Sequence, residues 1–292
     1  MSDNSKIEWT DATWNPVTGC SVVSPGCTNC YAMGLAGTRL RNHPSRAGLT
    51  IDTKAGPVWN GQVRLNEDWL TQPLKWRRPR MIFVCAHGDL FHENVPDEWI
   101  DRVFRVINMT PRHTYQILTK RARRMRQYMS DQERVIQVAF EGRAEWPPRN
   151  AWLGVSAEDQ TRADERVPEL LATPAAVRFV SAEPLLGPLD LDHYLRAASH
   201  RYVGPITDRA LQWIIVGGES GPNARPMHPA WARAIRDQCA AAGVAFFFKQ
   251  FGEFAPDDDT PGAHTAMRRV GKARAGRILD GRTHDDTPQR SA

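Results

Sequence analysis

Three of the chain's five cysteines lie in one short segment. Cys20, Cys27 and Cys30 follow the spacing C-x6-C-x2-C, with glycine and proline residues between them that allow a loop to wrap an ion. Thiolates bind zinc and iron–sulfur clusters, and three cysteines leave one iron of a [4Fe–4S] cluster open to another ligand. The spacing therefore predicts a metal site.

Four interpretations compete for residues 19–30, which we call the cysteine loop. A structural zinc site needs a fourth ligand, which His43 or His87 could supply. A disulfide would leave one thiol over and is disfavoured in a reducing compartment. Three buried structural cysteines would not need the glycine and proline residues around them. A three-cysteine loop that precedes a (β/α) barrel favours the fourth interpretation, a [4Fe–4S] cluster, while zinc stays possible. Cys85 and Cys239 lie in apolar segments and are expected in the core.

Short apolar segments alternate with helical patterns through the middle of the chain. Strands are expected at Met81–Cys85, Thr114–Leu118, Trp152–Val155, Val177–Val180, Gln212–Val216 and Ala245–Phe248. Helices are expected at Asp97–Met109, at Thr161–Ala172 with a division at Pro168, and at Pro229–Ala242. This alternation predicts an α/β fold with a parallel sheet, arranged as a (β/α) barrel or partial barrel.

Each expected strand is followed by a polar cluster. The carboxyl ends of parallel barrel strands gather on one face, and that face carries the active site. The charged residues expected there are Asp89, Lys120, Glu158, Glu183, Glu219 and Lys249. We expect these side chains to line the active site.

Basic residues form three runs, although the net charge of the chain is only +5. Clustered Lys and Arg residues neutralise phosphates, and an aromatic side chain beside them can stack on a base. The sequence therefore indicates a nucleic-acid partner, with expected contacts from Lys75, Trp76, Arg77, Arg78, Arg121, Arg123, Arg124, Arg268, Arg269 and Lys272.

Composition limits the class of protein. The 292 residues are 41% hydrophobic and 24% charged, which is typical of a soluble globular protein and excludes a fibrous or disordered one. No membrane span and no signal peptide are expected, which favours the cytoplasm. We expect a barrel domain over residues 1–254 with an insertion near 37–62, followed by a basic, partly flexible C-terminal flap over 255–292.

The cysteine loop also carries a family resemblance. The segments at residues 13–20 and 26–32 look like those of a phage and bacterial three-cysteine-motif family, and further matches lie at residues 88–92, 118–121, 183–185, 217–221 and 248–250. That family resembles the radical S-adenosylmethionine superfamily, with spore photoproduct lyase as the suggested parallel. The usual spacing in the superfamily is C-x3-C-x2-C, whereas the first gap here is six residues.

The resemblance implies a mechanism and site residues. Cys20, Cys27 and Cys30 would hold a [4Fe–4S] cluster, and reductive cleavage of S-adenosylmethionine would give a 5′-deoxyadenosyl radical that abstracts hydrogen from the substrate. Cofactor-binding roles are expected for Tyr31, Asp89, Lys120, Ser156, Glu158, Gly217, Gly218 and Glu219. Of these, Gly217–Glu219 is similar to the superfamily segment that holds the methionine amino group. Glu183 and Lys249 are the expected catalytic residues.

The favoured function is therefore a radical enzyme that repairs or modifies nucleic acid, with an electron donor such as flavodoxin or ferredoxin. The main alternative is a zinc-containing nucleic-acid-binding module without catalysis. A radical enzyme that acts on a small molecule or peptide is the third hypothesis.

Overall fold

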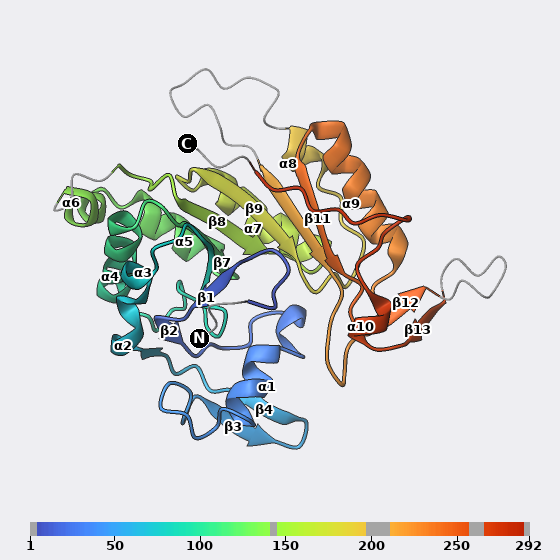
Figure 1. The fold of residues 1–292 in the computed structure, drawn as a ribbon, viewed down its shortest axis with the longest axis horizontal. Helices are drawn as coiled ribbons and strands as arrows, with labels where there is room; N and C mark the ends of the chain where they lie inside the picture. Colours follow the sequence, from blue (N-terminus) through green and yellow to red (C-terminus); the bar gives the residue numbers. More distant parts are fainter. Residues whose placement is uncertain (1–4, 141–144, 197–210, 257–265, 289–292) are drawn as a thin grey trace. The chain divides into compact units, whose positions relative to one another are not determined.

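The computed structural model describes residues 5–140, 145–196, 211–256 and 266–288 (Figure 1). Its main sheet has seven strands in the order β1-β6-β7-β8-β9-β10-β11. The strands are β1 (Ala12–Trp14), β6 (Met81–Val84), β7 (Thr114–Thr119), β8 (Ala151–Ser156), β9 (Val177–Ala182), β10 (Trp213–Gly217) and β11 (Ala245–Gln250). Pairing is parallel between β1 and β6, β6 and β7, β9 and β10, and β10 and β11.

This sheet confirms the predicted fold class. All six expected strands are present, and β6, β8, β9 and β10 are buried along their whole length, as is typical of parallel strands with both faces covered. The order begins at β1 and ends at β11, so among the described strands the sheet is the partial rather than the closed form of the barrel. Sequence analysis missed β1, whose three residues are too few to show a period.

The connections between strands contain amphipathic helices. They are α4 (Asp97–Met109), α5 (Ala122–Ser130), α6 (Gln132–Phe140), α7 (Gln160–Ala172), α8 (Asp192–Arg196) and α9 (Pro229–Ala242). In α4, Ile100, Val103, Phe104 and Ile107 are buried on one face, as in an amphipathic helix that packs on a core. Helix α9 ends at Gly243, whose φ of 68° is the left-handed conformation that glycine adopts most easily.

The predicted division of α7 at Pro168 is wrong. The helix runs without interruption from Gln160 to Ala172 with Pro168 inside it. A proline in a helix interior removes one backbone hydrogen bond and costs about 3 kcal/mol. Val167 and Leu170 are completely buried, so core packing on both sides of the proline outweighs this local cost.

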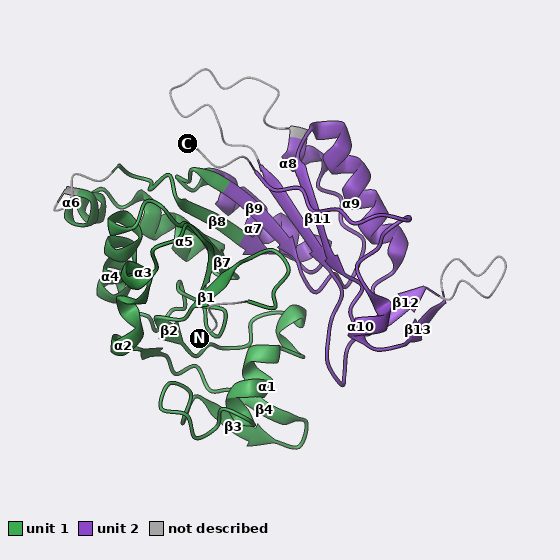
Figure 2. Cartoon of the chain, in the orientation of Figure 1, with its two compact units in different colours: residues 1–154, 172–177, 291–292 green, residues 155–171, 178–290 purple. Residues whose placement is uncertain are grey.

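The chain forms two compact units (Figure 2). Unit 1 comprises residues 1–154, 172–177 and 291–292, and unit 2 comprises residues 155–171 and 178–290. Unit 1 holds β1, β6 and β7, and unit 2 holds β10 and β11. Residues 255–256 and 266–288 of the expected flap belong to unit 2, and its residues 257–265 and 289–292 lie outside the described part of the chain.

The expected insertion near residues 37–62 contains regular structure and not a long loop. Strands β3 (Thr50–Thr53) and β4 (Gly56–Trp59) form an antiparallel hairpin whose turn consists of Lys54 and Ala55. Gly56, the first residue of β4, has a φ of 112°. The hairpin contacts α1 (Tyr31–Gly37), and a Cβ atom on Gly37 would lie 2.0 Å from the Cβ of Pro57. The hairpin therefore fixes the helix that follows the cysteine loop.

Short elements complete both units. In unit 1 these are β2 (Val17–Thr18), the 3-10 helix η1 (Pro25–Cys27), β5 (Arg64–Leu65), α2 (Glu67–Leu70) and α3 (Gln72–Lys75). In unit 2, β12 (Phe254–Pro256) pairs with β13 (Met267–Arg269), and α10 (Lys272–Ala275) follows. The backbone around His284 then bonds to β11, since the Phe248 N–H donates to the His284 carbonyl over 2.9 Å. No helix in the described ranges is long and apolar enough to cross a membrane.

Candidate functional site

Each cysteine of the loop occupies a defined place in unit 1. Cys20 follows β2, Cys27 ends η1, and Cys30 directly precedes α1. Turn hydrogen bonds order the loop, because the Cys27 N–H donates to the Ser24 carbonyl (2.9 Å) and the Cys30 N–H donates to the Cys27 carbonyl (3.3 Å). All three thiols are free. The short turns thus bring the three cysteines to one end of α1.

The three thiols lie close enough to affect one another. Burial raises the pKa of the Cys20 thiol to about 12, and the Asp89 carboxylate and the other two cysteines add to this rise. Cys20 and Cys30 also pack against the same buried apolar cluster, which consists of Ala32, Met33, Ala36, Leu49 and Trp59. Cys20 is therefore held as a neutral thiol that must lose its proton before it can bind a metal.

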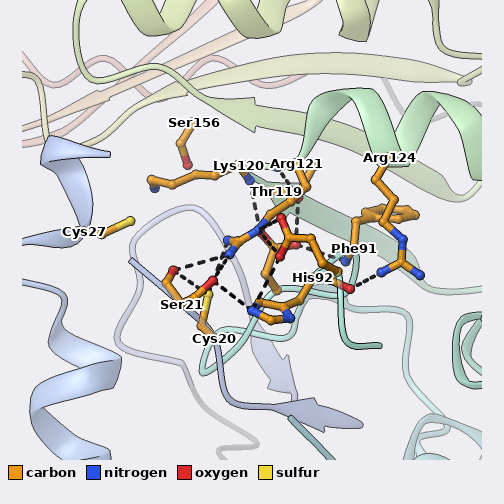
Figure 3. A network of polar contacts seen from close by, with 12 residues as sticks. Cys20, Ser21, Cys27, Phe91, His92, Thr119, Lys120, Arg121, Arg124 and Ser156 are labelled. Atoms are coloured by element: carbon orange, nitrogen blue, oxygen red, sulfur yellow. Dashed lines mark hydrogen bonds and ion pairs between the residues drawn. The ribbon is translucent and has the colours of Figure 1, made fainter. Parts of the chain in front are cut away.

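Arg121 forms a hydrogen bond with Cys20 and with several neighbouring residues (Figure 3). Its Nη1 donates to the Cys20 Sγ over 3.4 Å and to Asp89 Oδ2 over 3.2 Å. Its Nη2 donates to the Ser21 Oγ over 2.7 Å, and its Nε donates to the Glu93 carboxylate over 3.2 Å. Burial alone would lower the pKa of Arg121, but Asp89, Cys20 and Glu93 outweigh burial and raise it. Arg121 therefore stays charged beside the cysteine.

Asp89 organises the strand ends around this arginine. Its Oδ1 accepts from the Thr119 hydroxyl (2.7 Å) and from the Phe91 N–H (3.0 Å). Its Oδ2 accepts from the Lys120 N–H over 3.1 Å as well as from Arg121. The carboxylate is buried, and these bonds join the segment after β6 to the segment after β7. The geometry favours a positioning role for Asp89. Lys120 contacts Asp89 through its backbone N–H.

Sequence reasoning missed Ser21, His92, Glu93 and Thr119 as parts of this network. His92 Nε2 lies 2.9 Å from the Ser21 Oγ, and its Nδ1 accepts from the Asn94 N–H over 3.1 Å. Because Nδ1 accepts, we assign the proton of the neutral ring to Nε2, which donates to Ser21. The available signal was the position of His92 and Glu93 shortly after β6, where polar strand ends were already expected.

The donor set fits an iron–sulfur cluster. Three free thiols on one loop are the ligands that such clusters use. Within the described residues, no group of three or more His, Cys, Asp or Glu side chains could hold a metal ion as arranged. A four-iron cluster binds its cysteines at separate corners, so it does not require three thiols to converge on one point as a single zinc ion does.

Tyr31 and His87 lie beside the loop. The Tyr31 hydroxyl donates to the Ala86 carbonyl over 2.7 Å, and its ring meets the His87 ring edge-on at 5.8 Å between centroids. The Tyr31 side chain is half exposed. It is therefore fixed at the hydroxyl end and accessible along the ring, which is compatible with the expected contact to a cofactor.

We expect acid to destabilise the fold through His87. Burial lowers its pKa to about 4, and the Arg46 guanidinium adds to the effect. Since an unfolded His titrates near 6.5, the unfolded chain binds more protons than the folded chain between about pH 6.5 and 4. Stability is therefore complete above about pH 6.5 and falls toward pH 4, by at most roughly 1.4 kcal/mol per pH unit.

Urea unfolding at several pH values measures this effect. The variant His87→Phe keeps the ring contact with Tyr31 and removes the titration, so its stability should change less over that pH range. The same slope in the variant and the parent would show that other groups cause the acid effect.

In unit 2, the two expected catalytic residues form an ion pair at the carboxyl ends of β9 and β11. Lys249 Nζ lies 3.0 Å from Glu183 Oε1, and the Ser181 hydroxyl donates to Glu183 Oε2 over 3.0 Å. A Cβ atom on Gly217 would lie 2.7 Å from Glu183 Oε1, so the glycine makes room for the carboxylate. The structure thus brings together Glu183, Lys249 and Gly217, which the sequence had indicated as site residues.

Glu219 is already held by an arginine. Arg225 Nη2 donates to Glu219 Oε1 (2.6 Å), and Arg225 Nε donates to Glu219 Oε2 (2.8 Å). Packing alone requires a glycine at position 218, because a Cβ atom there would lie 2.0 Å from the Phe251 carbonyl oxygen. A ligand's ammonium group would have to share the Glu219 carboxylate with Arg225.

Glu158 forms a completely buried pair with Arg166. Arg166 Nη1 donates to Glu158 Oε2 over 3.1 Å and to the Ser156 carbonyl over 2.8 Å. The side chains of Glu158 and Arg166 are 0% and 2% exposed. Ser156 is also buried, so the geometry of this group favours a structural role for Glu158 over the expected contact with a cofactor.

The structure separates the expected nucleic-acid contacts into two groups. Trp76 is buried, Arg121 is buried, and Arg124 is directed inward to the Val95 carbonyl and the Asp97 carboxylate. Those three side chains are therefore poorly placed to meet a polyanion. The exposed members are Lys75, Arg77, Arg78 and Arg123 in unit 1, and Arg268, Arg269 and Lys272 in unit 2.

Comparisons with known proteins give one family and two distant structures. A sequence model of the family described as "Protein of unknown function (DUF5131)" matches residues 4–288. No curated protein matches the sequence. A solved structure of a spore photoproduct lyase mutant is similar over 82% of this chain and 63% of its own, at 12% identity and a TM-score of 0.43.

The second structure is a spore photoproduct lyase complexed with dinucleoside spore photoproduct. It is similar over 76% of this chain and 58% of its own, at 10% identity and a TM-score of 0.39. This chain therefore spans less than two thirds of either lyase chain.

Proposed function

The chain belongs to the family described as "Protein of unknown function (DUF5131)", and we propose that it is a radical S-adenosylmethionine enzyme. The observation that carries the proposal is the cysteine loop. Its three free thiols lie at one end of α1, and Arg121 bonds to one of them. The resemblance to the phage and bacterial three-cysteine family, which rests on the segments around the loop, is part of this proposal.

Cys20, Cys27 and Cys30 would hold the [4Fe–4S] cluster. When bound, the cluster would supply the electron that cleaves S-adenosylmethionine to a 5′-deoxyadenosyl radical. Ser21, Asp89 and Arg121 keep the loop in place, while the accessible ring of Tyr31 is a candidate to contact the cofactor. The electron donor in the cell would be a protein such as flavodoxin or ferredoxin.

In unit 2, the Glu183–Lys249 pair offers a carboxylate and an ammonium group that can exchange a proton or bind polar groups of a substrate. Nucleic acid is the proposed substrate class, for repair or base modification. The support for it is the set of exposed basic residues at 75, 77, 78 and 123 in unit 1 and at 268, 269 and 272 in unit 2.

Anaerobic purification and reconstitution test the proposal. We expect about four irons per chain, a broad brown absorbance, and formation of 5′-deoxyadenosine after addition of S-adenosylmethionine and dithionite. We also expect binding of DNA or RNA that weakens as salt rises. Stoichiometric zinc without iron, even after reconstitution, would overturn the radical mechanism, and iron without salt-sensitive binding would overturn only the nucleic-acid substrate.

A further inference from the structure

We propose that Arg121 is a positioning residue that fixes Cys20 as a cluster ligand and raises the reduction potential of the bound cluster. This inference rests on the proposed function. In the sequence, Arg121 belongs to the basic run at residues 120–126. In the structure its side chain is buried and bonded to Cys20.

The first support is how completely the guanidinium is held. Its side chain is 5% exposed, and all three of its nitrogens donate hydrogen bonds. Nη1 reaches the Cys20 Sγ, and Nη2 bonds to both the carbonyl (3.3 Å) and the hydroxyl of Ser21. An arginine bonded to two successive residues of the loop limits where the Cys20 sulfur can lie.

The second support is the way the arginine is anchored. Asp89 holds it from the segment after β6, and Asp89 is itself fixed by the Thr119 hydroxyl and the Lys120 N–H after β7. Glu93 bonds to the Nε, and its side chain is 59% exposed. The guanidinium therefore keeps its place whether or not Cys20 is bound to a metal.

The third support is electrostatic. One-electron reduction adds a negative charge to a cluster, and a cation or hydrogen-bond donor at a ligating sulfur stabilises that charge. The effect is strong where water is excluded, and Arg121 is buried. The carboxylates of Asp89 and Glu93 oppose it, so removing the arginine would also leave their charge uncompensated near the cluster.

The test measures the reduction midpoint of reconstituted chains by titration with dithionite against visible absorbance. Arg121→Met is expected to lower the ratio of reduced to oxidised cluster about tenfold at a fixed potential, a shift of about 59 mV for one electron. Arg121→Lys keeps the positive charge but loses the planar guanidinium group. It should lower the midpoint by a smaller amount than Arg121→Met does. Arg102→Met removes an arginine whose pairing with Glu67 is exposed, and should leave the midpoint unchanged.

Glu93→Gln supplies a second test with the opposite sign. It removes an exposed carboxylate from the same guanidinium, so folding is not at risk and the midpoint should rise. Equal midpoints in the parent and Arg121→Met, at equal iron content, would overturn the inference and leave the proposed function intact. A midpoint at or below the parent value in Glu93→Gln would also contradict it. A parent chain that binds no iron would overturn the proposed function and this inference together.

Discussion

Replacing Cys27 with Ala is expected to abolish cluster binding and, with it, formation of 5′-deoxyadenosine. Cys27 ends η1 and its backbone bonds to Ser24 and Cys30, so the change removes one thiol without removing the turn. Two cysteines from one loop are too few to retain a cubane cluster. Iron per chain should fall from about four to below about one, and the brown absorbance should disappear.

Cys239→Ala is the matched control. Cys239 is free and completely buried on α9 in unit 2, so its loss costs packing but removes no expected ligand. Its iron content should equal that of the parent. If Cys27→Ala kept about four irons, or if both variants lost iron to the same extent, the loop would not be the cluster site.

The second large effect is expected in unit 2, where Arg166→Met should destabilise the fold by about 3–5 kcal/mol. The variant removes the hydrogen bonds that Arg166 donates to the fully buried Glu158 carboxylate and to the Ser156 carbonyl. Removing one partner of a buried ion pair costs far more than removing one partner of a surface pair. Urea unfolding, with the free energy extrapolated to water, gives the value directly.

Two further variants separate charge from packing. Arg162→Met removes an arginine of the same helix whose pair with Glu165 is partly exposed, and it should cost less than about 1 kcal/mol. The double variant Arg166→Met/Glu158→Gln should recover part of the loss, since the buried Glu158 carboxylate is then absent as well. A cost below about 1 kcal/mol for Arg166→Met would show that the pair does not support the fold. If the double variant still cleaved S-adenosylmethionine, Glu158 would be structural.

Local patterns were sufficient to predict six of the seven strands of the main sheet. Apolar runs such as those of β6 and β10 are buried on both faces in a parallel sheet, so burial leaves a continuous signal in the sequence. The helical patterns of α4 and α9 are equally local, and both helices were predicted with the observed bounds. Pro168 was misread because its local cost is visible in the sequence while the core packing that offsets it is not.

The residue types of the site were also determined by the sequence. The sequence alone determines that three cysteines lie at short spacing and that a charged residue follows each expected strand. Their partners were decided only by tertiary structure. Arg121 belongs to a run of basic residues in the sequence, yet it is buried against Cys20, which lies 101 positions away. Glu183 pairs with Lys249, and Glu219 pairs with Arg225.

The physical reason is that a charged side chain has the same sequence signature on the surface and in the interior. Which of the two applies depends on whether a partner of opposite charge is brought beside it, because burying an unpaired charge is costly. Parallel strands bring distant segments together at their carboxyl ends, and these contacts leave no periodic pattern in the chain. The sequence therefore determined the chemistry that is available, and the tertiary structure decided which groups are already paired and which remain free to act.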